Sequence, residues 1–208
     1  MLRSKFDTDR ISVKIGLIFS GFGISPNMWT LLALIPAVFG FLSLYSGDIL
    51  TALILFLISG FIDAIDGAVA RVTGRATAMG AFLDGIIDRY VEILIYLGLL
   101  FFILPMETEF YLPNAVWLAL LIFGALMPTY IRAYADHRDV VTEPEDHKKM
   151  GGLLERAERL SILYIGMLFS CYDPNFMIYF IAILAILANV TALQRLWFVV
   201  NYRKRGHA

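Results

Sequence analysis

Six long apolar stretches divide this 208-residue chain, and they restrict its fold more than any other feature of the sequence. Each is about 20 residues or longer, enough for a helix to cross a bilayer core of about 30 Å. A hydrophobic content of 59% and a mean hydropathy of +0.73 exclude an ordinary water-soluble domain. We therefore predict an all-α integral membrane protein with six transmembrane helices. The predicted spans are 27–46, 49–72, 80–104, 114–136, 153–172 and 175–200.

The residues before the first stretch mix charged and apolar side chains. This mixture, without a small-residue cleavage pattern, argues against a signal peptide. Apolar residues such as Ile11, Ile15 and Ile18 instead predict a short amphipathic helix that lies on the membrane surface. We expect one domain over the whole chain, with three parts. These are a cytoplasmic juxtamembrane segment at 1–24, a six-helix bundle at 25–200 and a cytoplasmic tail at 201–208.

The positive charges indicate how the chain crosses the membrane. All 17 Lys and Arg lie in the N-terminal segment, around the turn after the second stretch, around the loop after the fourth, or near the C-terminus. With six spans, these places are all on one side of the membrane. The turns on the other side contain acidic residues but no Lys or Arg. The positive-inside rule therefore predicts a multi-pass protein of the cell membrane with both termini in the cytoplasm.

Four aspartates stand at the cytoplasmic ends of the second and third stretches. Asp63 and Asp66 are three residues apart, and Asp84 and Asp88 are four apart, so each pair lies on one helix face. The short connection makes the two helices antiparallel neighbours, and the two pairs can face each other. An aspartate inside a membrane helix costs about 2.5–3.5 kcal/mol, which favours a bound cation. Carboxylate oxygens suit Mg²⁺, and two such pairs can hold two ions.

The same segment resembles a family signature. It reads Asp63-x-x-Asp66-Gly67-x-x-Ala70-Arg71, then eight residues, then Gly80-x-x-x-Asp84-x-x-x-Asp88. This pattern is similar to the complete signature of the CDP-alcohol phosphotransferase (CDP-alcohol phosphatidyltransferase) family, and the resemblance covers essentially the whole chain. It implies an enzyme of phospholipid synthesis that transfers a phosphatidyl-type group, diacylglycerol or archaeol phosphate, from a CDP-lipid to a small alcohol and releases CMP. It also implies a homodimer in membrane lipid; no nucleic-acid partner is expected.

The resemblance implies a role for each residue of the signature. Asp63, Asp66 and Asp84 are expected to bind two Mg²⁺ ions, with Mn²⁺ as an alternative. Asp88 is expected to complete this metal site and to act as the general base. Gly67 allows close approach of a phosphate, and an arginine supplies several donors to it. The residues implied to contact the CDP-lipid are Pro26, Asn27, Met28, Trp29, Asp66, Gly67, Arg71, Thr77 and Gly80.

Four arginines are candidates for binding the acceptor. Arginines at membrane depth are costly without a partner, and a phosphorylated acceptor would provide one. The stretches YIRAYA, ERAER and LQR resemble family members that make phosphatidylinositol phosphate or its archaeal ether counterpart, which implies inositol phosphate as the acceptor. The chain departs from that pattern at Tyr134, where a further arginine is common, so glycerol phosphate, free inositol or serine stays open. The four arginines are Arg132, Arg156, Arg159 and Arg195.

Two other classes also place carboxylates in membrane helices. A cation transporter would hold them near the bilayer midplane, whereas here they lie at one side and no second DxxD motif appears in the other half. An intramembrane prenyltransferase also uses aspartates and Mg²⁺, but it typically needs more helices. The three histidines, His137, His147 and His207, are expected in loops or in the tail without a catalytic role. The phosphotransferase is therefore the preferred interpretation.

Overall fold

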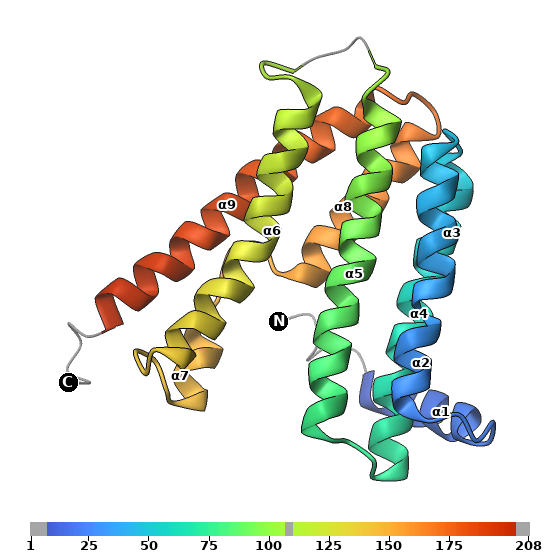
Figure 1. The fold of residues 1–208 in the computed structure, drawn as a ribbon, viewed down its shortest axis with the longest axis vertical. Coiled ribbons are helices and arrows are strands. Elements are labelled where there is room, and N and C mark those ends of the chain that lie inside the picture. The colour runs from blue at the N-terminus through green and yellow to red at the C-terminus, as the bar shows by residue number, and fades with distance from the viewer. Residues whose placement is uncertain (1–7, 107–109, 203–208) are drawn as a thin grey trace. The chain divides into compact units, whose positions relative to one another are not determined.

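The computed structural model describes residues 8–106 and 110–202, apart from the side chains of residues 8–10, 144 and 148. Within these ranges the regular secondary structure consists of nine helices (Figure 1) and one isolated bridge between Phe110 and Leu112. The predicted all-α class is therefore confirmed. The chain separates into two compact units, Met1–Leu99 and Leu100–Ala208, each of which is described by itself. Most of the tail, residues 203–208 with His207, lies outside the described residues.

The first unit is built around one long helix. Its helices are α1 (Thr8–Ser20), α2 (Pro26–Leu32), α3 (Leu34–Tyr45), α4 (Ile49–Thr73) and most of α5 (Ala78–Ile103). Helices α1, α2 and α3 all pack against α4. Only Ala33 separates α2 from α3, so the first predicted span is two nearly continuous helices. Pro36 accounts for the break, because it has no N–H to bond the carbonyl of Leu32.

Local signals fix both ends of α4. The side chain of Asp48 caps its start and accepts a hydrogen bond from the amide of Thr51 at 3.0 Å. Gly74 ends it in the left-handed conformation, with φ at 65°, where a residue without a Cβ avoids strain. Helix α5 begins at Ala78, four residues later. This short connection places the end of α4 beside the start of α5.

The second unit contains the end of α5 and four further helices. They are α6 (Asn114–His137), α7 (Pro144–Lys149), α8 (Arg156–Ser170) and α9 (Phe176–Tyr202). Helix α9 packs against α6 and α8. Gly124 of α6 lies so close to α9 that an added Cβ would be 2.9 Å from the Cβ of Ala188. The expectation that the histidines lie in loops or in the tail is wrong for two of them. His137 ends α6, and His147 lies in α7.

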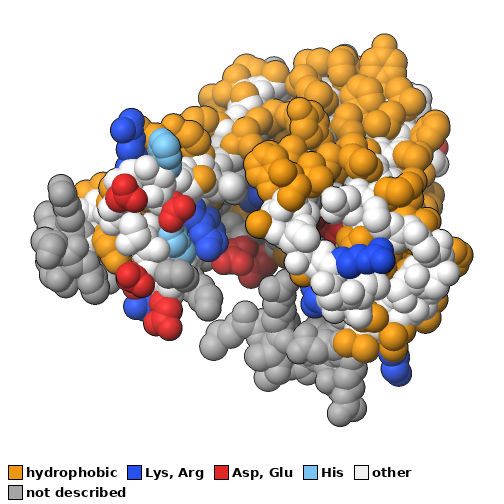
Figure 2. Space-filling model, turned by 60° about the horizontal axis from the view of Figure 1, so that its bottom comes forward, with side chains coloured by type: hydrophobic (Ala, Val, Ile, Leu, Met, Phe, Trp, Pro, Cys, Tyr) orange, Lys and Arg blue, Asp and Glu red, His pale blue; other side chains and the backbone are white. Residues whose placement is uncertain are grey.

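Four segments of the described chain are long and apolar enough to cross a membrane. They are Pro26–Tyr45, Ile49–Thr73, Asn114–His137 and Phe176–Tyr202. Figure 2 shows hydrophobic side chains over broad areas of the surface, with charged and histidine side chains in patches. The protein is therefore a membrane protein. Helix α5 has 26 residues but carries four charged side chains, and α8 has only 15 residues, so neither has the length and composition of an ordinary span.

Candidate active site

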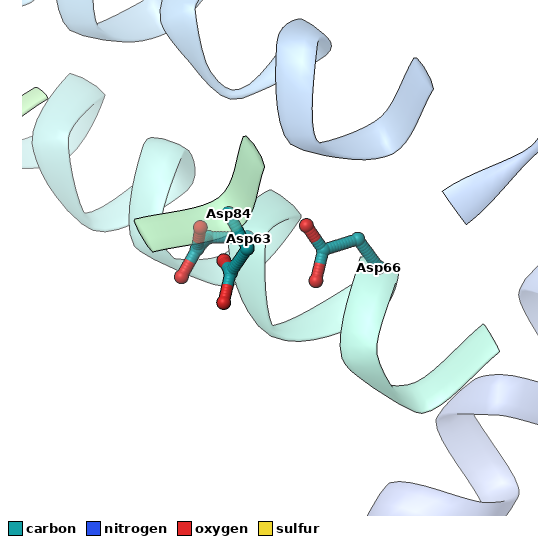
Figure 3. A group of neighbouring side chains, drawn as sticks. All are labelled: Asp63, Asp66 and Asp84. Carbon is teal, nitrogen blue, oxygen red and sulfur yellow. The ribbon is translucent and has the colours of Figure 1, made fainter. Parts of the chain in front are cut away.

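Three of the predicted metal ligands lie together in the first unit. Asp63 and Asp66 come from α4 and Asp84 from α5, and one carboxylate oxygen of each lies within 4.8 Å of the others. Figure 3 shows the carboxylates of Asp63 and Asp84 side by side, with that of Asp66 turned toward them. Asp66 is 6% exposed and accepts a hydrogen bond from the hydroxyl of Thr30. Three carboxylates at this separation repel one another and fit a divalent cation, which prefers oxygen ligands.

Asp88, the fourth predicted member, is not one of these three. It lies one turn beyond Asp84 on α5, and its negative charge acts on Asp66 together with that of Asp84. Its predicted roles, metal ligand and general base, remain predictions.

A cavity of about 180 Å³ lies beside the aspartates. Seven of the nine residues predicted to contact the CDP-lipid line it; Met28 and Trp29 are not among its lining residues. Met28 is 54% exposed, and the ring of Trp29 packs edge-on against that of Phe19 at 5.5 Å. The lining residues are Pro26, Asn27, Thr30, Asp66, Gly67, Ala70, Arg71, Arg75, Ala76, Thr77, Gly80, Ala81 and Asp84.

Two glycines line this cavity. A Cβ on Gly67 would stand 3.4 Å from Nη1 of Arg71, and one on Gly80 would stand 3.2 Å from the hydroxyl of Thr77 and 3.3 Å from Oδ1 of Asn27. The amide of Gly80 also donates to the Thr77 hydroxyl at 3.0 Å. A side chain at Gly80 would therefore crowd the polar groups of Thr77 and Asn27, whereas a Cβ at Gly67 would make an ordinary contact with the guanidinium of Arg71.

Helix α1 contributes to this site, which the sequence did not predict. Arg71 donates from Nη2 to the hydroxyl of Ser12 on α1 at 2.6 Å. Gly16, one turn later, lies directly against the backbone of α4. A Cβ added at this position would be only 2.5 Å from the carbonyl oxygen of Ala68. Thr30 was also missed, since one threonine on an apolar helix gives no signal of a carboxylate partner. Helix α1 thus holds the guanidinium of Arg71 beside the cavity.

The predicted acceptor arginines belong to the second unit. Arg159 of α8 is only 3% exposed. Arg195 of α9 donates from Nη1 to the carbonyl of Pro128 at 2.9 Å, while its buried Nε has no hydrogen-bond partner among the described residues. The charge of Glu155 acts on Arg195 more strongly than that of either Arg132 or Arg159, and the two arginines act in the opposite direction. Arg132 and Arg159 are therefore close enough to act on Arg195, with the acidic Glu155 among them, and Arg156 begins α8.

Comparison with known proteins identifies the family. The sequence model for CDP-alcohol phosphatidyltransferases matches residues 23–201. The chain belongs to the CDP-alcohol phosphatidyltransferase family. This membership confirms the resemblance carried by the aspartate signature and makes the protein an enzyme, a transferase of substituted phosphate groups.

Relatives of this phosphatidyltransferase include two archaeal enzymes. It is 29% identical over 185 residues to the archaetidylinositol phosphate synthase of Pyrococcus horikoshii, with 88% of each chain covered. It is 35% identical over 155 residues to the archaetidylinositol phosphate synthase of Methanothermobacter thermautotrophicus, with 74% of this chain and 72% of that one covered.

The fold also matches solved structures of one bacterial enzyme. This is the phosphatidylinositol phosphate synthase of Mycobacterium tuberculosis, at 26% identity and a TM-score of 0.77. The crystal structure with CDP-DAG bound is matched over 91% of this chain and 94% of that one. The structure in complex with manganese and citrate is matched over 91% and 88%.

Proposed function

We propose that this phosphatidyltransferase moves a phosphatidyl-type group from a CDP-lipid to inositol phosphate and releases CMP. The observation that carries the proposal is the convergence of three aspartates beside a cavity that Gly67 and Arg71 line. The names of the relatives support it, because they are synthases of archaetidylinositol phosphate and phosphatidylinositol phosphate.

The aspartates are proposed to hold two Mg²⁺ ions, with Mn²⁺ as an alternative. Asp63, Asp66 and Asp84 supply the close oxygens, and Asp88 is proposed to complete the set. Bound divalent cations supply charge neutralisation for the diphosphate and for the departing CMP. The manganese complex of the mycobacterial enzyme supports a divalent cation in this family.

The donor is proposed to lie in the cavity of the first unit. Arg71 presents several N–H donors to the diphosphate, and Gly67 permits close approach of a phosphate oxygen. The start of α2, residues 26–29, together with Thr77 and Gly80, is proposed to contact the rest of the CDP group. The CDP-DAG complex of the relative supports a CDP-lipid as the donor class.

Asp88 is proposed to be the general base. It accepts the proton of the attacking hydroxyl, whose oxygen then bonds to the phosphorus that carries the lipid. The bond from that phosphorus to the CMP oxygen breaks. Asp88 suits this role because it stands one helical turn from Asp84, so one side chain can approach both the metal site and the acceptor.

The acceptor phosphate is proposed to bind Arg132, Arg156, Arg159 and Arg195. The charges of Arg132 and Arg159 both act on Arg195, which supports this role because a phosphate can accept hydrogen bonds from more than one guanidinium. Glycerol phosphate, free inositol and serine are the alternatives. Free alcohols would leave these arginines without a phosphate partner, so we favour a phosphorylated acceptor.

The topology is proposed to have six spans within a single domain, and the protein is proposed to be a homodimer of the cell membrane. The termini and the aspartates then face the cytoplasm. Helix α5 can enter the membrane because buried Glu92 accepts hydrogen bonds from Arg89 at 2.6 Å and from Tyr96 at 2.8 Å. Helix α1 is proposed to lie on the membrane surface, because Leu17 and Ile18 are 59% and 65% exposed.

The test measures CMP release by the purified protein. CDP-diacylglycerol and CDP-archaeol are each supplied with Mg²⁺ and one acceptor: inositol phosphate, glycerol phosphate, inositol or serine. Asp63→Asn, Asp66→Asn, Asp84→Asn and Asp88→Asn should each abolish release, whereas Asp48→Asn, at the other end of α4, should not. Wild-type rates in the first four variants would refute the proposed chemistry. Cation uptake into proteoliposomes without CDP-lipid would favour a transporter instead.

A further inference from the structure

The second unit contains a cavity of about 270 Å³ that is lined mostly by polar residues. Helix α6 lines it with Thr129, Arg132, Ala133 and Asp136, whose spacing of three and four residues puts them on one face of the helix. His147 of α7 completes the lining. A guanidinium, a carboxylate, a hydroxyl and an imidazole on the lining residues suit a polar ligand and not a lipid chain.

Contacts from two helices hold α7 in place. The carboxylate of Asp146, which is 7% exposed, accepts a hydrogen bond from the hydroxyl of Tyr202 on α9 at 2.7 Å and another from Lys149 at 2.7 Å. Met150, directly after α7, packs in an apolar cluster with Ala135 of α6 and with Tyr202. The neighbouring His147 is therefore positioned by the fold.

The two ring nitrogens of His147 have different surroundings. The residue is 9% exposed, and its Nε2 lies 3.0 Å from Oδ1 of Asp136. Its Nδ1 is buried and has no hydrogen-bond partner in the described part of the chain. Buried polar atoms are rarely left unpaired, and because His147 lines the cavity, a ligand bound there can supply the missing partner. A carboxylate at Nε2 favours the tautomer with the proton on Nε2, which leaves Nδ1 as an acceptor.

We propose that this cavity binds the acceptor through two groups: Arg132 binds its phosphate, and Nδ1 of His147 accepts a hydrogen bond from one of its hydroxyls. The inference rests on the proposed function and adds His147 as a residue that determines acceptor specificity. Asp136 is a positioning residue, because it fixes the tautomer and orientation of the ring. A site that hydrogen-bonds a substrate hydroxyl rejects compounds without that hydroxyl. Recognition of a phosphate and a hydroxyl together defines a polyol phosphate.

The test uses two substitutions that separate the ring nitrogens. His147→Gln can keep a polar atom near the position of Nε2 but has none at Nδ1, and His147→Asn does the reverse. His147→Gln should raise the KM for inositol phosphate about tenfold, which equals about 1.4 kcal/mol, without changing kcat or the KM for the CDP-lipid. His147→Asn should recover most of the affinity. His137→Gln, at the exposed end of α6, should retain the wild-type KM.

Inorganic phosphate separates the two proposed contacts. As a competitive inhibitor it should bind less tightly to Arg132→Gln but equally well to His147→Gln, because it has no polyol hydroxyl. A thermal melt of each variant reports on folding. The inference is wrong if the wild-type protein releases CMP and His147→Gln keeps the wild-type KM for inositol phosphate. It is also wrong if His147→Gln raises the KM for inositol phosphate and the KM for the CDP-lipid equally. If wild-type protein releases no CMP from any CDP-lipid, the proposed function itself fails.

Discussion

The contact between α1 and α4 yields a prediction that can be worked from atomic distances. In the substitution Gly16→Ala, the new Cβ would lie 2.5 Å from the carbonyl oxygen of Ala68 and 2.6 Å from Cγ2 of Val72. Helix α4 packs against α2 and α3 as well, so α1 must move instead. Overpacking of this kind costs about 1–3 kcal/mol. For a chain of this length, the melting temperature should fall by roughly 2–12 °C.

The same displacement should weaken donor binding. Ser12 lies one turn before Gly16, so movement of α1 pulls its hydroxyl away from Nη2 of Arg71. Loss of this hydrogen bond is worth about 1 kcal/mol, which corresponds to a rise of about fivefold in the KM for the CDP-lipid. Ser12→Ala should raise this KM similarly with a smaller change in melting temperature. Ser12→Thr, which keeps the hydroxyl, should restore it.

Two measurements check the prediction, namely thermal unfolding in detergent and CMP release over a range of CDP-lipid concentrations. The matched control is Gly21→Ala, just after α1, where an added Cβ would meet only the carbonyl oxygen of Ile18 at 3.5 Å. This substitution should leave both values unchanged. If Gly16→Ala melted at the wild-type temperature and bound the CDP-lipid equally well, α1 would not be locked against α4, and the reasoning would be refuted.

Three further predictions concern single polar groups. Thr30→Val removes the hydroxyl that donates a hydrogen bond to buried Asp66, so it should raise the Mg²⁺ concentration for half-maximal activity several-fold. Thr30→Ser keeps the hydroxyl and should not change this concentration. A Mg²⁺ titration of CMP release checks both variants. Arg195→Gln should raise the KM for inositol phosphate about tenfold but leave any use of free inositol unchanged in an acceptor comparison. Hydrogen bonds from Thr51 lower the pKa of Asp48, so its stabilising effect is present at neutral pH and is lost as the pH falls through that lowered pKa. Melting of Asp48→Asn should lack this acid-dependent loss.

The aspartate cluster could be predicted from the sequence because it depends on local geometry. Spacings of three and four residues place a pair on one helix face, and a short connection brings two successive helices together. The structure accordingly brings Asp63, Asp66 and Asp84 within 4.8 Å of one another. Most residues of the donor cavity were implied by the family resemblance, and they lie in or near its signature or at the start of α2.

Contacts made by short elements could not be predicted in this way. The periodicity of α1 indicates an apolar face but not the helix on which its other face packs, so the Ser12 contact with Arg71 was missed. Residues 145–149 are all polar or charged, and α7 carries no apolar repeat, so this segment was expected to be a loop. The burial of His147 depends on Asp136, eleven residues away, and on the docking of α7 through Tyr202.

In both units, a short element outside the six predicted spans holds a proposed binding group in place. Helix α1 holds Arg71 through Ser12, and α7 carries His147 to the face of α6 that also presents Arg132. The aspartate signature specifies the metal and donor chemistry, but it does not include these supporting contacts. Two family members with the same signature and different short elements should therefore share the reaction and differ in donor affinity and acceptor preference. Exchange of α1 or of residues 143–150 between such members would alter these two properties separately.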